Sequence, residues 1–242
     1  GLLHTSVTNI LTLQNTSTVA AGNALSTSYV NGPMRYQKSS TGSSILNFPV
    51  GNGSDCRPVS LTVNHSNAVL YTYQTQLFNA SAAALGYTLP PLTDSVSPVH
   101  YYTIARTDAI GNNQPVAGLS GNQTIEIFFG SNDLITDGGR ITVVKNTYNN
   151  PTGWVDIGGI GGPPYAGGVN LTGSITSTSA PTAFNSFSTF AIGFRTLMIL
   201  PVNLLDFSAK PNNNVVDIEW TTAAESGNQF FIIEKSMDGT DF

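Results

Sequence analysis

The chain has little charge and very few basic residues. Charged residues make up 10% of its 242 residues, whereas about a quarter is usual in soluble domains. Only nine residues are lysine or arginine, and the formal net charge is −5. This composition excludes a basic stripe that would neutralise phosphate groups, so neither nucleic acid nor an anionic membrane surface is an expected partner.

Disulfides and long apolar runs are also missing. Cys56 is the only cysteine, which excludes an intrachain disulfide and leaves burial and hydrogen bonds to hold the fold. The most apolar stretch, residues 190–205, is interrupted by Gly193, Arg195 and Pro201, so no membrane-spanning helix is predicted. The first residues contain no basic segment of a signal peptide, and we expect any export signal to lie upstream.

Alternation of apolar and polar residues is the dominant pattern. In Thr124–Phe129, for example, Ile125, Ile127 and Phe129 fall on one face of a strand. The same reasoning predicts further strands at Ile10–Leu13, Ile45–Val50, Val59–Val63, Val69–Leu77, Tyr101–Arg106, Arg140–Lys145, Trp154–Ile157 and Phe187–Arg195. Turn residues separate these runs at short intervals, which predicts an all-β fold, an antiparallel, jelly-roll-like β-sandwich.

Two segments depart from this pattern. Asn79–Leu85 is rich in alanine and is the only predicted short helix. Gly158–Gly168 is rich in glycine and proline and is predicted to be a surface loop.

A second unit is predicted to begin near residue 200. Three strands are expected there, at Leu204–Ala209, Val215–Thr221 and Phe230–Ser236. An immunoglobulin-like sandwich needs about seven strands and about 100 residues. We therefore expect residues 1–198 to form the sandwich module, with residues 1–30 open to interpretation as the end of an upstream repeat. Residues 199–242 are expected to form the N-terminal half of an immunoglobulin- or fibronectin-like domain, truncated in this sequence.

The order of several short blocks resembles a known kind of protein. In the second unit the blocks are Leu200-Pro201-Val202, Trp220-Thr221-Thr222-Ala223-Ala224-Glu225 and Ser236-Met237-Asp238-Gly239. In the first unit they are Asn31-Gly32-Pro33, Phe48-Pro49-Val50-Gly51-Asn52-Gly53, His100-Tyr101-Tyr102, Trp154-Val155-Asp156 and Phe190-Ala191-Ile192-Gly193. Together they resemble a sandwich and the following Ig-like module in cell-surface and secreted proteins of the Bacteroidota.

This resemblance implies an exported protein of the outer surface. In that family the Ig-like module is followed by a C-terminal sorting domain, which the type IX secretion machinery recognises. The rest of the Ig-like domain and the sorting domain are not in this sequence. The family's modules act as adhesins or spacers, some of them gliding-related, so the resemblance implies a structural or adhesion module with surface glycans or other surface proteins as partners.

No pattern in the sequence indicates catalysis or a cofactor. The three histidines, His4, His65 and His100, fall in no catalytic signature, and no Gly-x-Ser-x-Gly motif occurs. Before Pro201 the only glutamate is Glu126, which disfavours a glycosidase with paired carboxylates. We expect a chain that is not an enzyme, and we expect it to lack a deep pocket with clustered titratable groups.

Binding and modification sites are less easily set aside. Asn132, Asp133 and Asp137 crowd one predicted loop, where they are either ordinary turn residues or oxygen ligands for Ca²⁺. Asp94-Ser95-Val96 resembles the Asp-Ser/Thr-aliphatic site of O-glycosylation in exported Bacteroidota proteins, which makes Ser95 a possible glycosylation site.

Sugar binding is the alternative function. Tyr71 and Tyr73 lie on the same face of one predicted strand, as either a sugar-stacking platform or buried core residues. The alternative to an adhesion module is therefore a carbohydrate-binding module, or the accessory stalk of a secreted polysaccharide-degrading enzyme. Cys56, between Asp55 and Arg57, is either a thiol activated by the arginine or a small residue in a turn.

Overall fold

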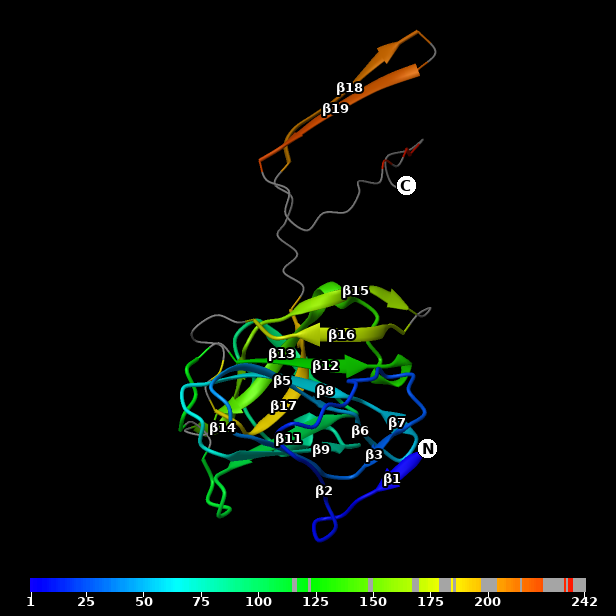
Figure 1. The fold of residues 1–242 in the computed structure, drawn as a ribbon. Coiled ribbons are helices and arrows are strands. Elements are labelled where there is room, and N and C mark those ends of the chain that lie inside the picture. Colours follow the sequence, from blue (N-terminus) through cyan, green and yellow to red (C-terminus); the bar gives the residue numbers. More distant parts are fainter. Residues whose placement is uncertain are drawn as a thin grey trace. The chain divides into compact units, whose positions relative to one another are not determined.

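The chain divides into two compact units. The structure is a computed structural model, and it describes residues 1–114, 117–121, 123–147, 150–166, 170–178, 184, 186–196, 204–213, 215–223, 233 and 235–236. The first unit is Gly1–Thr196 and the second is Leu197–Phe242 (Figure 1). The expected boundary at residue 198 thus lies two residues beyond the observed one.

The described elements are almost all strands. They are β1 (Leu2–His4), β2 (Leu11–Leu13), β3 (Tyr29–Asn31), β4 (Met34–Lys38), β5 (Gly42–Phe48), β6 (Val50–Asn52), β7 (Asp55–Cys56), β8 (Val59–His65), β9 (Tyr71–Phe78), β10 (Thr93–Val96), β11 (Tyr101–Thr107), β12 (Thr124–Phe129), β13 (Ile141–Thr147), β14 (Asn150–Asp156), β15 (Ile160–Ala166), β16 (Thr172–Thr176), β17 (Thr189–Arg195), β18 (Leu204–Asn212) and β19 (Val215–Thr222). Three short 3₁₀ turns complete the list: η1 (Ala82–Leu85), η2 (Ser131–Asp133) and η3 (Gly138–Arg140). The all-β prediction is confirmed.

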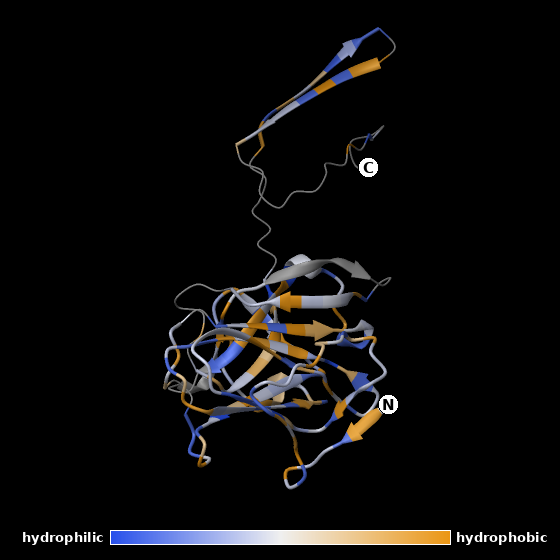
Figure 2. Ribbon diagram, viewed as in Figure 1, coloured by the Kyte–Doolittle hydropathy of each residue, from blue (hydrophilic) through white to orange (hydrophobic). Residues whose placement is uncertain are grey.

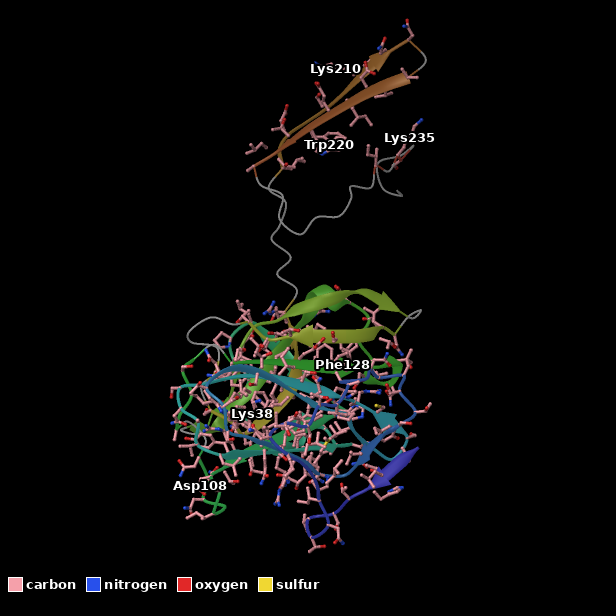
Figure 3. All side chains as sticks on the ribbon, in the orientation of Figure 1. Lys38, Asp108, Phe128, Lys210, Trp220 and Lys235 are labelled. Carbon is pink, nitrogen blue, oxygen red and sulfur yellow. The ribbon has the colours of Figure 1, made fainter. Side chains whose placement is uncertain are left out.

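The first unit is a β-sandwich. Its larger sheet has the order β14-β13-β17-β11-β9-β4-β2, with β10 also paired to β17, and the facing sheet has the order β15-β16-β12-β8-β5. A small third sheet, β1-β3-β6-β7, lies at the N-terminal side (Figure 1). Side chains fill the space between the two main sheets (Figure 3).

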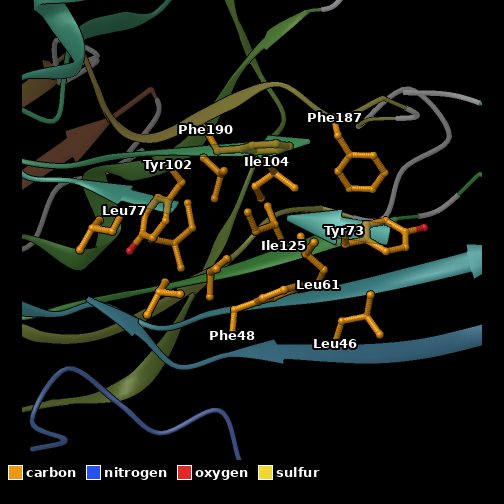
Figure 4. Close-up of a cluster of buried hydrophobic side chains, with 14 of the residues drawn as sticks. Leu46, Phe48, Leu61, Tyr73, Leu77, Tyr102, Ile104, Ile125, Phe187 and Phe190 are labelled. Atoms are coloured by element: carbon orange, nitrogen blue, oxygen red, sulfur yellow. The ribbon is translucent and has the colours of Figure 1, made fainter. Parts of the chain in front are cut away.

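The core follows from the alternation in the sequence. Along β9, buried and half-buried residues alternate over the whole strand, and β12 behaves in the same way. Facing strands bring their apolar residues together between the sheets (Figure 4). The largest members of this core, all nearly inaccessible to solvent, include Leu46, Phe48, Leu61, Tyr73, Leu77, Ile104, Ile125, Phe129 and Phe190. Trp154 anchors a second small cluster with Ala82, Val96, Val144 and Ala191.

The N-terminal residues are part of this sandwich. β1 pairs in parallel with β3, and β2 pairs in parallel with β4. The amide of Asn47 also donates a hydrogen bond to the carbonyl of Val19, which packs against the core. Residues 1–30 therefore contribute strands to the first unit, and the sandwich is not purely antiparallel.

The prediction that Gly158–Gly168 forms a loop was wrong, because this segment contains the edge strand β15. β15 pairs with β16 alone, and the register shifts between Gly162 and Ala166, where two prolines occur. Proline is tolerated at an edge or a bulge, since the missing N–H need not complete a ladder. The predicted helix at Asn79–Leu85 is reduced to η1, which ends at Gly86 in the left-handed conformation.

In the second unit the described strands form a hairpin. β18 and β19 pair antiparallel, with Phe207 opposite Trp220 and Ala209 opposite Ile218. Hydrophobic and hydrophilic residues alternate along both strands (Figure 2). The third predicted strand, Phe230–Ser236, lies mostly outside the described residues, and the Ig-like assignment stays a prediction. Among the residues that the structure describes, no helix has the length and hydrophobicity needed to cross a membrane.

The alternation along β5 provides a direct test of the core. Phe48 is fully buried, whereas Ile45 on the same strand is 65% exposed. We expect Phe48→Ala to lower the free energy of unfolding by about 3–5 kcal/mol, because it removes buried area and leaves a cavity. Ile45→Ala is the matched control and should cost less than about 0.5 kcal/mol. Urea denaturation of both variants checks this, and equal losses would contradict the assigned burial.

Candidate functional site

One end of the sandwich gathers charged side chains from three parts of the chain. Antiparallel register places Val59 opposite Ile127 and Phe78 opposite Tyr101. The start of β8 therefore lies beside the end of β12, and the start of β11 lies beside the end of β9. Arg57 lies just before β8, His100 just before β11, and Asp133 in η2 just after β12. We call these three residues the Asp133 cluster.

Asp133 is the centre of this cluster. Asp133 is only 4% exposed. Its Oδ2 accepts hydrogen bonds from Arg57 Nε at 2.5 Å and from the backbone N–H of Gly130 at 2.7 Å. The other oxygen is hydrogen-bonded to Nδ1 of His100. Burial alone would raise the pKa of Asp133, but the hydrogen bond with His100 and the charge of Arg57 outweigh it and hold the pKa below its usual value. The carboxylate therefore stays ionised in the interior.

The surroundings of Arg57 are equally close-packed. Its Nη1 donates to the carbonyl of Cys56 at 2.7 Å. A side chain at Gly130 would place Cβ 2.8 Å from Arg57 Nη2, so it would have to displace the guanidinium from its present position. Burial raises the pKa of the Cys56 thiol to about 11, and the positive charge of Arg57 offsets only part of this rise. Cys56 is thus a buried residue in its protonated form and not an activated thiol.

A pocket of about 330 Å³ opens beside the cluster. It is lined by Asp55, Asn79, Ala80, Pro98, Val99, His100 and Asn132. We call it the Asp55 pocket, because the carboxylate of Asp55 is its central polar group. Asn132 donates to Asp55 Oδ1 at 2.7 Å and Asn79 donates to Oδ2 at 3.2 Å. Nε2 of His100 lies 3.5 Å from the same Oδ2.

The expectation that no titratable groups would cluster beside a pocket was therefore wrong. A histidine oriented by a buried aspartate is the base half of a nucleophilic triad. The nearby hydroxyl of Ser97, however, accepts hydrogen bonds from the backbone N–H groups of Val99 and His100. Within the described residues, the partner recorded for His100 Nε2 is the carboxylate of Asp55, not a hydroxyl or thiol. His100 and Asp55 thus lie side by side where they line the pocket.

The three residues considered as calcium ligands have separate roles. Asp133 is held by Arg57 and His100, and Asn132 donates to Asp55. Asp137 caps η3 by accepting the N–H of Gly139 at 2.8 Å. In the part of the chain that the structure describes, no group of three or more His, Cys, Asp or Glu residues is arranged to hold a metal ion.

The tyrosines considered as a sugar platform lie inside the protein. Tyr71 and Tyr73 are 4% and 0% exposed, so the platform interpretation was wrong. They close the opposite end of the sandwich, where the fully buried Arg106 donates from Nε to the hydroxyl of Tyr73 at 2.9 Å. The guanidinium carbon lies 3.5 Å from the centre of the Tyr71 ring. With His65, whose Nε2 lies 2.5 Å from the Tyr73 hydroxyl, these residues form the Arg106 cluster.

Ser95 and Glu126, two further positions considered in the sequence, lie among the described residues. Ser95 is exposed on β10, next to the exposed Asp94 and the buried Val96, so the serine is accessible. Asp94 accepts hydrogen bonds from Thr196 Oγ1 at 2.7 Å and Arg140 Nη2 at 3.3 Å. Glu126 faces outward and accepts a hydrogen bond from Ser174 at 2.8 Å.

These features define the first unit as a β-sandwich whose two ends are each closed by a buried, hydrogen-bonded cluster around an arginine. Beyond this structural class the comparisons add nothing, because no protein-family model, no curated protein and no solved structure matches the chain.

The Asp133 cluster predicts a large difference between two aspartates of one loop. Asp133→Asn should destabilise the fold by about 3–5 kcal/mol, because it leaves the charge of Arg57 buried without its counter-charge. Asp137→Asn, on an exposed capping residue, is the matched control and should cost less than about 1 kcal/mol. Chemical denaturation of both variants measures the difference. Similar stabilities would mean that the buried ion pair is unimportant.

The Arg106 cluster predicts a pH dependence. Burial, and then the positive charge of Arg106, lower the pKa of His65 from 6.5 to about 4. Between these two values the unfolded chain binds more protons than the folded one, so stability falls as the pH falls from 6.5 to 4. The loss is on the order of 3 kcal/mol.

A His65→Gln variant isolates this effect, because glutamine does not titrate. The difference in unfolding free energy between the unmodified chain and the variant should shrink by that amount from pH 7 to pH 4. The exposed His4→Gln variant is the control and should follow the unmodified chain. A constant difference across this range for His65→Gln would contradict the prediction.

Proposed function

We propose that this chain is a non-catalytic structural or adhesion module of a large exported cell-surface protein, and that the full-length protein is a substrate of type IX secretion. We propose the cell surface as its location because its sequence blocks resemble surface modules of the Bacteroidota. The structural observation that supports the module is the closure of both sandwich ends by paired, buried polar groups.

The polar groups of the Asp133 cluster hydrogen-bond to one another, which suits a role in stabilising the fold rather than in a reaction. The carboxylate of Asp133 accepts from Arg57, from His100 and from the backbone of Gly130. His100 Nε2 faces the carboxylate of Asp55, whereas a nucleophilic triad has a hydroxyl or thiol at that place. This is why we prefer a structural or adhesion role to an enzymatic one.

A carbohydrate-binding module or an enzyme's accessory stalk is the second candidate. Tyr71 and Tyr73 do not support it, because both are buried. The Asp55 pocket does support it, because polar side chains converge there beside apolar lining residues.

The proposal is tested on intact cells that make the full-length protein. Protease added outside the cells should release peptides of this chain while a cytosolic marker stays intact. The released peptide that contains Ser95 should carry added glycan mass, and Ser95→Ala should remove it. Ser43→Ala, at an exposed serine of β5 outside any such triplet, should not change it.

Two results would count against these statements separately. Release of the peptides only after cell lysis would refute surface display. An unmodified Ser95 on a displayed protein would refute the glycosylation site alone.

A further inference from the structure

We propose that the Asp55 pocket binds a single neutral sugar unit of a glycan. This inference rests on the proposed adhesion function, because it names the class of ligand that the module would recognise. It concerns residues other than the tyrosines that the sequence suggested, and it follows from the shape, charge and hydrogen-bonding groups of the pocket.

The polar floor of the pocket is fixed in advance. The side chain of His100 is only 6% exposed, and its Nδ1 is bound to Asp133, so the ring cannot turn without breaking a buried hydrogen bond. Its Nε2 faces Asp55, whose carboxylate is also held by the amides of Asn79 and Asn132. Preorganised groups of this kind lose little entropy when a ligand binds.

The groups that reach the ligand suit hydroxyls. Asp55 offers carboxylate oxygens as acceptors, and the exposed Asn132 offers both a donor and an acceptor. The amide nitrogen of Asn79 already donates to the carbonyl of Asn52 at 2.9 Å and to Asp55, so this residue offers its carbonyl oxygen. A sugar hydroxyl donates and accepts at once, so neighbouring hydroxyls can bind the carboxylate and the amides together. An alkylammonium group only donates and would leave the amide N–H of Asn132 without a new acceptor.

The remaining wall is apolar. Ala80, Pro98 and Val99 line it, and the N–H groups of Val99 and His100 donate to Ser97 Oγ, which fixes this turn. A pyranose ring has a C–H face that packs on such a surface while its hydroxyls reach the polar side. The pocket combines the apolar and polar surfaces that small-molecule sites use.

Charge and size narrow the ligand further. Asp55 is the carboxylate that lines the pocket, whereas the guanidinium of Arg57 is already bound by Asp133. Phosphate, sulfate and acidic sugars would therefore meet a negative charge, and neither lysine nor arginine is among the residues that line the pocket. A volume of about 330 Å³ lies near the lower end of ligand pockets, which fits one sugar unit.

Titration of the whole chain with neutral sugars tests the proposal. Glucose, galactose, mannose, xylose and N-acetylglucosamine, and oligosaccharides built from them, serve as probes in calorimetry and NMR. We expect at least one of them to bind, with Asn79, His100 and Asn132 among the perturbed residues. Asp55→Ala, Asn79→Ala and Asn132→Ala should each weaken binding by about tenfold, the effect of losing one good hydrogen bond.

Matched controls separate binding from folding. Asn112→Ala and Asp137→Asn change exposed residues elsewhere and should bind as the unmodified chain does. Thermal unfolding of Asn79→Ala and Asn132→Ala should match that of Asn112→Ala, because all three amides are exposed.

Several results would overturn the proposal. They are failure of every neutral sugar to bind, binding that the three pocket variants leave unchanged, or binding restricted to calcium chloride, inorganic phosphate or butylamine. If the chain is displayed on the surface but binds no neutral sugar, sugar binding by the Asp55 pocket is refuted and the proposed surface module is not. A chain that binds sugar but is found only inside cells refutes the proposed function and leaves the pocket.

Discussion

The carboxylate of Asp133 is the interaction on which one whole end of the sandwich depends. It joins Arg57, which precedes β8, to His100, which precedes β11, and so connects the two facing sheets without a covalent bond. A buried charge is tolerated only when its partners are all in place. At the opposite end, Arg106 binds no carboxylate among the described residues; the hydroxyl of Tyr73, a backbone carbonyl and an aromatic face take that role. In a chain with so few charges, four are buried among the described residues: Arg57, Arg106, Asp133 and Lys145.

Period-two alternation made the central strands predictable from sequence. β12 was expected with its observed bounds, because Ile125, Ile127 and Phe129 alternate without interruption. Seven other strands were missed, because each has at most two large apolar positions, too few to establish a period: β1, β3, β4, β6, β7, β10 and β16. β15 was missed for a different reason, since glycine and proline indicate a loop unless a neighbouring edge recruits the backbone.

The site was far less predictable than the fold. Asp133 was noticed, but as a turn residue or metal ligand, because its partners Arg57 and His100 lie far from it in sequence. Tyr73 was placed correctly on its strand face, and the polar residues Thr72 and Gln74 on the other face of β9 already favoured burial of that face. The signal that was available is the scarcity of basic residues, which makes a charged residue at the start of a strand worth examining as a buried partner.

The position of β17 has a mechanical consequence. This strand is the last of the first unit, and it lies inside the larger sheet, with β13 on one side and β11 and then β10 on the other. Tension that reaches the unit through residue 197 pulls on a strand whose removal breaks two ladders at once. Tension at the N-terminus meets only the three-residue pairings of β1 and β2. The two ends of the unit therefore resist force differently, since the first strands are held by fewer backbone pairings than the last strand.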